Sequence, residues 1–218
     1  MVEENKNFYG YMMIIAIDGP SGVGKGTLSR RVAQHYGLLH LDTGLIYRTL
    51  GLLLHKEGMK AVEEEAALKI AKSMTLRQIA ESPDLRTQEV ASLASRVSVF
   101  PSVRSALLDM QREFASSDKG AVLDGRDVGT IVLPEADFKI FLMARPEVRA
   151  HRRLKELREK GIDPGLGEVL REILVRDRRD STRTAAPLKP AEDAYILDTS
   201  DLTADEVFQK TLSFVEKK

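Results

Sequence analysis

Short apolar runs alternate along the chain with longer segments in which apolar residues recur every three or four positions. The short runs occupy residues 13–17, 38–41, 121–123, 138–143 and 195–197. Continuous apolar runs of this length are typical of parallel strands buried on both faces, and the longer segments have helical spacing. The alternation predicts an α/β fold, in which a five-stranded parallel sheet carries helices on both faces.

The helices near the two ends of the chain have the clearest signals. Residues 25–36 place Leu28 and Val32 on one side, at helical spacing. The last helix should begin after Thr203, whose hydroxyl can cap it, and it presents Val207 among polar residues.

The length of 218 residues suits one domain with a sizeable core. Residues 43–120 are mostly helical in pattern and exceed a simple crossover, so we expect a substrate-binding insert there. Residues 161–187 begin with glycines and a proline that suit a hinge, and we interpret them as a lid. Residues 1–12 are polar and lack the pattern of a signal peptide, which predicts a flexible N-terminal extension.

A glycine-rich turn follows the first expected strand, with the sequence IDGPSGVGKGT at residues 17–27. Glycines allow backbone N–H groups to converge on phosphate oxygens, and the start of the next helix adds its positive end. Lys25 can reach the β- and γ-phosphates of a nucleotide, and Thr27 can assist a Mg²⁺ site. An ordinary strand-to-helix turn would need neither so many glycines nor a lysine among them.

A second polar cluster, LDTGLIYR at residues 41–48, follows the second expected strand. Open α/β sheets bind ligands beyond the carboxyl ends of their strands, so this turn should face the same crevice as the glycine-rich turn. Thr43 can cap the next helix or hydrogen-bond a ligand, and Arg48 lies within the first turns. A capped helix with a surface arginine is an equal alternative.

The sequence AVLDGRDVG at residues 121–129 is a stronger signal. Asp124 ends a buried strand, where an uncompensated carboxylate would be costly, so Mg²⁺ bound through water is a sensible partner. Arg126 can hold a phosphate with a fork of hydrogen bonds, which a lysine cannot do. Asp127 can accept hydrogen bonds from an exocyclic amine or hold a neighbouring arginine. The alternative is an Asp-Gly turn with surface charges.

An arginine-rich run occupies residues 176–183. If the preceding helix continues, one face carries Arg176, Arg179, Asp180 and Arg183. Phosphoryl transfer needs mobile cations that cover developing charge and exclude water, and a hinged arginine helix would supply them. A solvated charged face is the alternative. The apolar residues expected to anchor this helix are Leu166, Leu170, Ile173 and Leu174.

Three further arginines, Arg149, Arg152 and Arg153, predict a basic face on the helix after Pro146, from which one could cover a nucleotide base or phosphate. The four histidines show no metal-ligand spacing.

Composition limits the possible functions. Lys and Arg total 33, and Asp and Glu also total 33, so no overall field recruits nucleic acid or an anionic membrane. The chain contains no cysteine, which excludes thiolate chemistry and agrees with a cytoplasmic location. No apolar run approaches the length of a membrane span. Balanced charge, without an apolar stripe beyond the core, leads us to expect a monomer.

Five motifs, in order, resemble those of the bacterial cytidylate kinases: the glycine-rich turn, LDTGLIYR, RTQEV at residues 86–90, DGRDVGT and RDRRDS. DGRD and RD-x-x-D are much more specific than the glycine-rich turn, which many nucleotide enzymes share. The resemblance covers nearly the whole chain from residue 14. It implies a P-loop nucleoside monophosphate kinase fold with a monophosphate-binding insert and a lid. It also implies transfer of the ATP γ-phosphoryl group to CMP or dCMP, with Mg²⁺.

The resemblance further implies roles for single residues. ATP would bind to Gly19, Pro20, Ser21, Gly22, Val23, Gly24, Lys25, Gly26 and Thr27. The CMP site would consist of Thr43, Arg48, Ser95, Arg104, Arg126, Asp127 and Asp180. Ser95 and Arg104 would contact the cytosine, and Asp180 the ribose. The side chains acting on the phosphates would be Lys25, Arg126, Arg176 and Arg183.

The chain departs from the family pattern in two places. Thr43 stands where many members have serine, which preserves the hydroxyl. Residues 70–89 look short, because many bacterial relatives carry a longer insert there with alternating strands and a glycine-rich turn. We expect that small sheet to be trimmed or replaced by helix, with an effect on the margin of CMP over UMP.

Three alternative functions were weighed. The nearest is another monophosphate kinase, acting on UMP or AMP. A GTPase switch would need an Asn-Lys-x-Asp element, and Asn5-Lys6-Asn7-Phe8 lacks its aspartate. A module that binds ATP without turnover would leave the acceptor-side arginines without a role.

Overall fold

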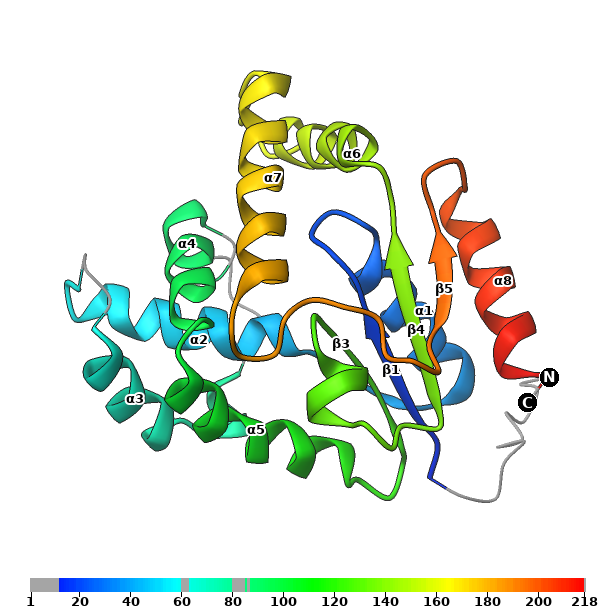
Figure 1. The fold of residues 1–218 in the computed structure, drawn as a ribbon, viewed down its shortest axis with the longest axis horizontal. Helices are drawn as coiled ribbons and strands as arrows, with labels where there is room; N and C mark the ends of the chain where they lie inside the picture. Colours follow the sequence, from blue (N-terminus) through cyan, green and yellow to red (C-terminus); the bar gives the residue numbers. More distant parts are fainter. Residues whose placement is uncertain (1–11, 60–62, 80–84, 86, 218) are drawn as a thin grey trace.

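The computed structural model describes residues 12–59, 63–79, 85 and 87–217. The strands are β1 (Ile14–Asp18), β2 (Leu39–Asp42), β3 (Ala121–Gly125), β4 (Phe138–Met143) and β5 (Tyr195–Asp198). They form one parallel sheet in the order β2-β3-β1-β4-β5. Each strand lies where an apolar run predicts it, so the expected five-stranded parallel sheet is confirmed (Figure 1).

Helices cover both faces of the sheet, as predicted. Ile15 and Ile17 of β1 pack into one core with α1 (Lys25–Tyr36) and α8 (Ala204–Val215). Ala16, between them, belongs to a second core on the opposite face. The helices of that face are α2 (Thr43–Lys56), α3 (Glu64–Ser73), α4 (Gln88–Val97) and α5 (Pro101–Ala115). The alternation of side chains along a central strand therefore divides the apolar residues between two cores.

Both terminal helices begin and end as the sequence indicates. Helix α1 spans the predicted residues, and Gly37 ends it in a left-handed conformation, with a φ of 68°. Helix α8 starts after Thr203, whose hydroxyl accepts a hydrogen bond from the N–H of Glu206. The Glu206 carboxylate in turn accepts one from the Thr203 N–H, which completes a capping box.

The connection from β2 to β3 is helical throughout its described part. After α3 comes a short 3-10 helix, Leu76–Gln78, and no described residue of 70–89 is in a strand. Residues 80–84 and 86 lie outside the described part of the chain, as does the expected N-terminal extension apart from Met12. The limits of the insert as a functional unit, residues 43–120, stay a prediction.

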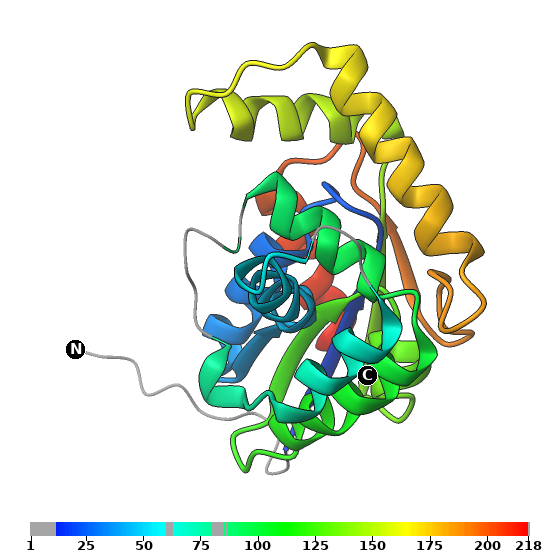
Figure 2. The ribbon, with the colours of Figure 1, turned by 90° about the vertical axis from the view of Figure 1, so that its left-hand side faces the viewer.

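The connection from β4 to β5 forms a helical hairpin of α6 (Pro146–Arg158) and α7 (Leu166–Thr182). Figures 1 and 2 show it beyond the carboxyl end of β4. Its own small core contains Ala150, Leu154, Val169 and Ile173. Two of the four expected anchors are wrong, because Leu166 and Leu174 are 36% and 48% exposed. The face of α7 that meets α6 is instead the one that carries Val169 and Ile173.

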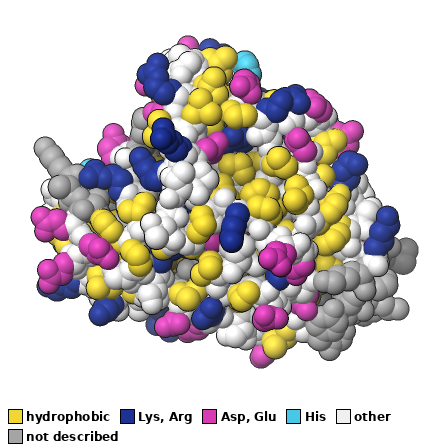
Figure 3. Space-filling view, viewed as in Figure 1, with side chains coloured by type: hydrophobic (Ala, Val, Ile, Leu, Met, Phe, Trp, Pro, Cys, Tyr) yellow, Lys and Arg dark blue, Asp and Glu magenta, His cyan; other side chains and the backbone are white. Residues whose placement is uncertain are grey.

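The surface agrees with the balanced composition. On the face in Figure 3, basic and acidic side chains are interspersed. Among the helices of the described residues, none is long and apolar enough to cross a membrane.

Candidate active site

The glycine-rich turn joins β1 to α1 in the centre of the sheet. Gly24 precedes α1 with a φ of 97°, a conformation that residues with a side chain rarely adopt. A Cβ at Gly19 would collide with the carbonyl oxygen of Leu142 on β4. The turn thus lies tightly against the sheet, and Lys25, Gly26 and Thr27 form the first turn of α1. All nine residues predicted to bind ATP belong to this one segment.

Lys25 is buried within that turn. Its Nζ donates hydrogen bonds to the carbonyl oxygens of Gly19 and Pro20, at 2.9 and 2.8 Å. Burial, and then repulsion from Arg126, lowers the pKa of Lys25 to about 7, although the charges of Asp124 and Asp42 oppose the shift. Its two hydrogen-bond acceptors are uncharged carbonyls, so an anion brought to Nζ would stabilise the protonated form.

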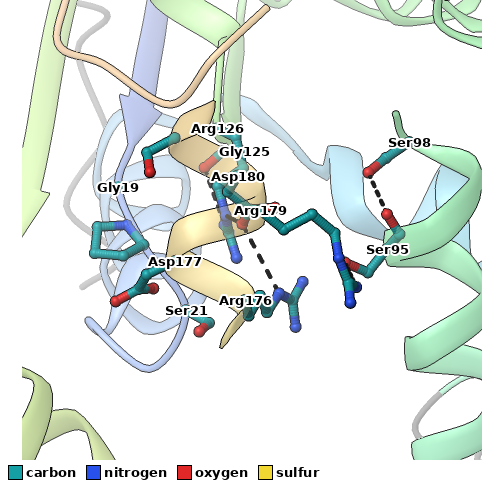
Figure 4. A network of polar contacts seen from close by, with 12 residues as sticks. Gly19, Ser21, Ser95, Ser98, Gly125, Arg126, Arg176, Asp177, Arg179 and Asp180 are labelled. Carbon is teal, nitrogen blue, oxygen red and sulfur yellow. Dashed lines mark hydrogen bonds and ion pairs between the residues drawn. The ribbon is translucent and has the colours of Figure 1, made fainter. Parts of the chain in front are cut away.

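Two arginines from other elements share one carboxylate beside Lys25 (Figure 4). Arg126, which follows β3, donates from Nε to Asp180 Oδ2 of α7 at 2.8 Å. Arg176 Nε lies 3.9 Å from the same oxygen and has no hydrogen-bond partner among the described residues. Burial, and then repulsion from Arg126, lowers the pKa of Arg176 to about 10.

Asp180 does not neutralise this cluster. Burial by itself would raise the pKa of the Asp180 carboxyl, but Arg126 and Arg176 hold it below its usual value. One carboxylate therefore faces two guanidinium groups, with the Lys25 ammonium nearby. The excess of positive charge is suited to the oxygens of phosphates.

A second cluster of predicted residues lies nearby. Asp127 pairs with Arg104 of α5 and, at 3.4 Å, with Arg183, which directly follows α7. The guanidinium carbon of Arg104 lies 5.6 Å from the centre of the Tyr47 ring. A hollow of about 210 Å³ is lined by Tyr47, Arg104 and Asp127, and by Ala186 among others. Of the two roles considered for Asp127, the structure shows the contact with arginines.

Ser95 lies at the edge of this region, on α4. Its hydroxyl oxygen accepts a hydrogen bond from Arg179 Nη1 of α7 at 2.8 Å, which joins the two helices (Figure 4). Arg48 on α2 acts electrostatically on both Asp42 and Arg176.

Thr43 does not cap α2. Asp42 is the N-cap and accepts the N–H of Gly44 at 2.8 Å, whereas the Thr43 hydroxyl donates to the carbonyl oxygen of Asp124 at 2.9 Å. The correction follows from β2 continuing to Asp42, one residue beyond the apolar run.

Two carboxylates at the ends of neighbouring strands could hold a divalent cation. Asp42 and Asp124 are opposite each other in the β2–β3 register. Burial raises the pKa of Asp42, and the charge of Asp124 raises it further, so a cation would relieve their repulsion. Two carboxylates with water fit Mg²⁺, which usually keeps several waters. No group of three or more metal-ligating side chains occurs in the described part of the chain.

The two residues predicted for Mg²⁺ differ in their surroundings. Asp124 is buried, and its Oδ2 lies 2.8 Å from His40 Nε2. Thr27 is exposed in the first turn of α1 and makes no hydrogen bond to Asp124. Sequence reasoning missed Asp42 and His40, although Asp42, like Asp124, lies directly after an apolar run.

Asp18 is another buried acid that the sequence did not single out. Its carboxylate accepts the N–H groups of Val128 and Gly129, at 2.9 and 2.7 Å. These residues open a π-helix, Val128–Val132, directly after the DGRD motif. Burial raises the pKa of Asp18 to about 6. The end of β1 thereby holds the turn that carries Arg126 and Asp127.

The expected basic face on α6 is wrong. Arg149 is buried, Arg152 donates to the hydroxyl and carbonyl oxygens of Thr199, and Arg153 pairs with Glu156. Their spacing can be read from the sequence, but the elements packed around them cannot.

With this geometry in place, comparison with known proteins identifies the family. A family model described as Cytidylate kinase matches residues 15–217. The chain belongs to the cytidylate kinase family. The cytidylate kinase of Paramagnetospirillum magneticum is 50% identical over 208 residues, covering 94% of this chain and 98% of that protein. That of Methylocella silvestris is 51% identical over 204 residues, covering 94% of both chains.

Solved structures support the fold of this family member. Shikimate kinase from Acinetobacter baumannii, in complex with shikimate, is 18% identical, with a TM-score of 0.51 and 98% of both chains covered. An uncharacterized protein from Eubacterium ventriosum has a TM-score of 0.53 at 14% identity, covering 95% of this chain and 100% of that one.

Proposed function

We propose that this chain transfers the γ-phosphoryl group of ATP to the phosphate of CMP or dCMP, giving ADP and the corresponding diphosphate. The observation that carries the proposal is that Arg126 and Arg176 converge on the single carboxylate of Asp180, at 2.8 and 3.9 Å, close to the buried Lys25. Repulsion among these cations contributes to the lowered pKa values of Lys25 and Arg176. Two facing anionic groups would relieve that repulsion. Membership of the cytidylate kinase family supports a cytidine monophosphate as acceptor.

The two clusters suggest how the substrates divide between them. ATP phosphates would lie on the glycine-rich turn with Lys25, because that turn offers backbone N–H groups and a helix N-terminus. The acceptor nucleotide would lie toward the hollow beside Arg104 and Asp127, with its phosphate at Arg126. Ser95 would contact the cytosine and Asp180 the ribose, as the resemblance implies.

The reaction needs no nucleophile from the protein. An oxygen of the acceptor phosphate attacks the γ-phosphorus while the bond to the ADP oxygen breaks, and that acceptor oxygen is already anionic at neutral pH. Catalysis then consists of alignment and charge neutralisation by Lys25, Arg126, Arg176 and Arg183. Asp42 and Asp124, with Thr27 through water, would hold Mg²⁺, which neutralises charge on the phosphates. The α6–α7 hairpin would exclude water that could otherwise take the phosphoryl group.

A coupled assay of ADP release tests both the acceptor and the site. We expect CMP and dCMP to be phosphorylated well above UMP, AMP and GMP. Lys25→Ala should lower kcat by on the order of 100–1000-fold with an unchanged circular dichroism spectrum. Lys210→Ala, a change at an exposed position on α8, is the control and should leave kcat unchanged. A clear preference for UMP or AMP would contradict the assigned acceptor, and a fully active Lys25→Ala would contradict the role of the lysine.

A cytoplasmic location, a monomeric state and a lid spanning residues 161–187 remain proposals based on the sequence.

A further inference from the structure

Arg149 connects three parts of the site through a single buried guanidinium. The residue lies on α6 and is 3% exposed. Its Nε donates to the carbonyl oxygen of Ala144 at 2.9 Å, just beyond β4. Its Nη1 donates to the carbonyl oxygen of Ser21 in the glycine-rich turn at 3.2 Å. Nη1 and Nη2 also form a fork with the Asp177 carboxylate of α7, at 3.0 and 2.6 Å.

The glycine-rich turn also rests on the backbone of this residue. A Cβ built on Gly22 would lie 3.3 Å from both the Cβ and the carbonyl oxygen of Arg149. The turn and α6 are therefore in close contact at one point, and the fork extends that contact to α7. In Figure 4, Asp177 and Ser21 lie on the side of α7 opposite to Ser95.

The fork opposes a repulsion within the site. Arg176, the neighbour of Asp177, is pushed away by Arg126 and lies near Lys25. Like charges repel, and Asp180 of α7 offsets this repulsion only in part because one carboxylate faces two guanidinium groups. The fork holds Asp177, the residue after Arg176, against Arg149. It therefore keeps the face of α7 that carries Arg176 close to the glycine-rich turn, where phosphates would bind.

We propose that Arg149 and Asp177 form a brace that fixes α7 over the glycine-rich turn, which makes Arg149 a positioning residue for phosphoryl transfer. The inference rests on the proposed function. Arg149 would not touch the transferred phosphoryl group and would act on it only through the glycine-rich turn and α7. Its loss leaves the backbone N–H groups of the turn in place but allows Arg176 to move away from the phosphates. Water then competes with the acceptor for the phosphoryl group.

The test compares two changes in the brace with matched changes elsewhere. Arg149→Lys keeps the charge but cannot form the fork, and Asp177→Asn removes the carboxylate. Arg145 and Asp201 form a similar fork at the start of α6, at 2.6 and 2.9 Å, but their side chains are 55% and 76% exposed. Arg145→Lys and Asp201→Asn are therefore the controls.

We expect each brace variant to lower kcat with CMP by on the order of 10–100-fold, the effect of small misplacement of reacting groups. The ratio of ATP hydrolysis to CMP phosphorylation should rise several-fold, and the KM for ATP should change little. The double variant should be no less active than the less active single variant, because both changes break the same fork. The two controls should match the wild type.

Several results would overturn the brace. They are kcat and hydrolysis ratios like those of the controls, additive losses in the double variant, or losses that only follow a reduced folded fraction measured by thermal denaturation. Asp177→Asn keeps the test informative if Arg149→Lys fails to fold, since Asp177 lies nearer the surface. A wild type that does not phosphorylate CMP would contradict the proposed function instead. In that case hydrogen exchange tests the brace, with faster exchange in α7 of Asp177→Asn expected and unchanged exchange overturning it.

Discussion

Lys25 shows how a single residue can be tuned by its surroundings. Its ordinary pKa is 10.5, and burial with nearby arginines lowers it to about 7. Between those two values the folded protein binds fewer protons at this residue than the unfolded chain does. Lys25 therefore destabilises the folded state fully below pH 7, and this effect declines as the pH rises from about 7 to 10.5, by the sign of the linkage relation. A bound polyphosphate raises the pKa of Lys25 again, because its negative charge stabilises the ammonium form.

Binding of ATP at pH 8 should therefore take up a proton. At that pH Lys25 is mostly neutral, whereas ATP is already fully ionised, so a proton entering the complex goes to the lysine. Titration calorimetry in buffers of different ionisation enthalpy measures the uptake. We expect up to one proton at pH 8, much less at pH 6, and none from Lys25→Met at pH 8. Equal uptake by the wild type and Lys25→Met would show that another group takes the proton.

Arg126 should contribute much more to the binding of CMP than to the binding of ATP. Arg126→Ala should weaken CMP binding by about 10–100-fold, the range for charge-assisted hydrogen bonds, and ATP binding by much less. Titration calorimetry with each nucleotide measures both affinities. Arg31→Ala is the control, since Arg31 pairs with Asp205 away from the site. An unchanged CMP affinity, or an equal loss for ATP, would contradict the position assigned to the acceptor phosphate.

At the scale of elements, the glycine-rich turn depends on backbone conformations and on room against β4. Gly19 and Gly24 both have a positive φ, at 151° and 97°. They differ in their surroundings, because a Cβ at Gly19 would overlap Leu142, whereas one at Gly24 would meet nothing within 4 Å. A side chain at Gly24 would therefore cause backbone strain alone, whereas one at Gly19 would cause strain and steric overlap together.

Gly24→Ala should lower the free energy of unfolding by about 1–2 kcal/mol, the cost of a left-handed conformation with a side chain. Gly19→Ala should cost clearly more, because β4 must shift as well. Urea denaturation monitored by circular dichroism measures both. Equal losses would mean that the backbone of Leu142 adapts at no cost.

The sequence predicted the elements better than their contacts. Helix α1 has the predicted limits, and the strand limits agree to within two residues, because apolar runs and caps act locally. The contacts of Arg149 and His40 were not predicted, because they depend on residues far away in the sequence. Their partners Asp177 and Asp124 are 28 and 84 residues away along the chain, and only the packing of α7 and β3 reveals them. Leu174 has the spacing of an anchor, but the position of α6 decides which face of α7 is covered.

At the scale of the whole molecule, the buried apolar residues in the described part of the chain form three separate clusters. The two larger ones lie on the two faces of the sheet, and the smallest joins α6 to α7. A cluster of four buried residues gives the hairpin an apolar core of its own, separate from the two cores of the sheet, to which its attachments are mainly polar. Local opening of the hairpin should cost less than unfolding of the sheet.

Ile173→Ala and Ile17→Ala test this independence. Ile173 is buried in the hairpin, whereas Ile17 is buried on β1, the central strand of the sheet. Ile173→Ala should lower the free energy of opening the hairpin, and Ile17→Ala that of unfolding the sheet, each by about 2–5 kcal/mol. Hydrogen exchange measured by mass spectrometry should quicken only in α6 and α7 for Ile173→Ala, and throughout the sheet for Ile17→Ala. Faster exchange in β1 with Ile173→Ala would show that the hairpin and the sheet open together.

The strand order has a consequence for how the protein can be altered. Strand β1, which leads into the glycine-rich turn, lies between β3 and β4, while the β2–β3 and β4–β5 connections lie on opposite sides of it. Each connection can lengthen, shorten or be replaced without passing through the other. Chimaeras that take the β2–β3 connection from a relative should therefore change the preference for the acceptor nucleotide and leave the ATP-binding turn unchanged.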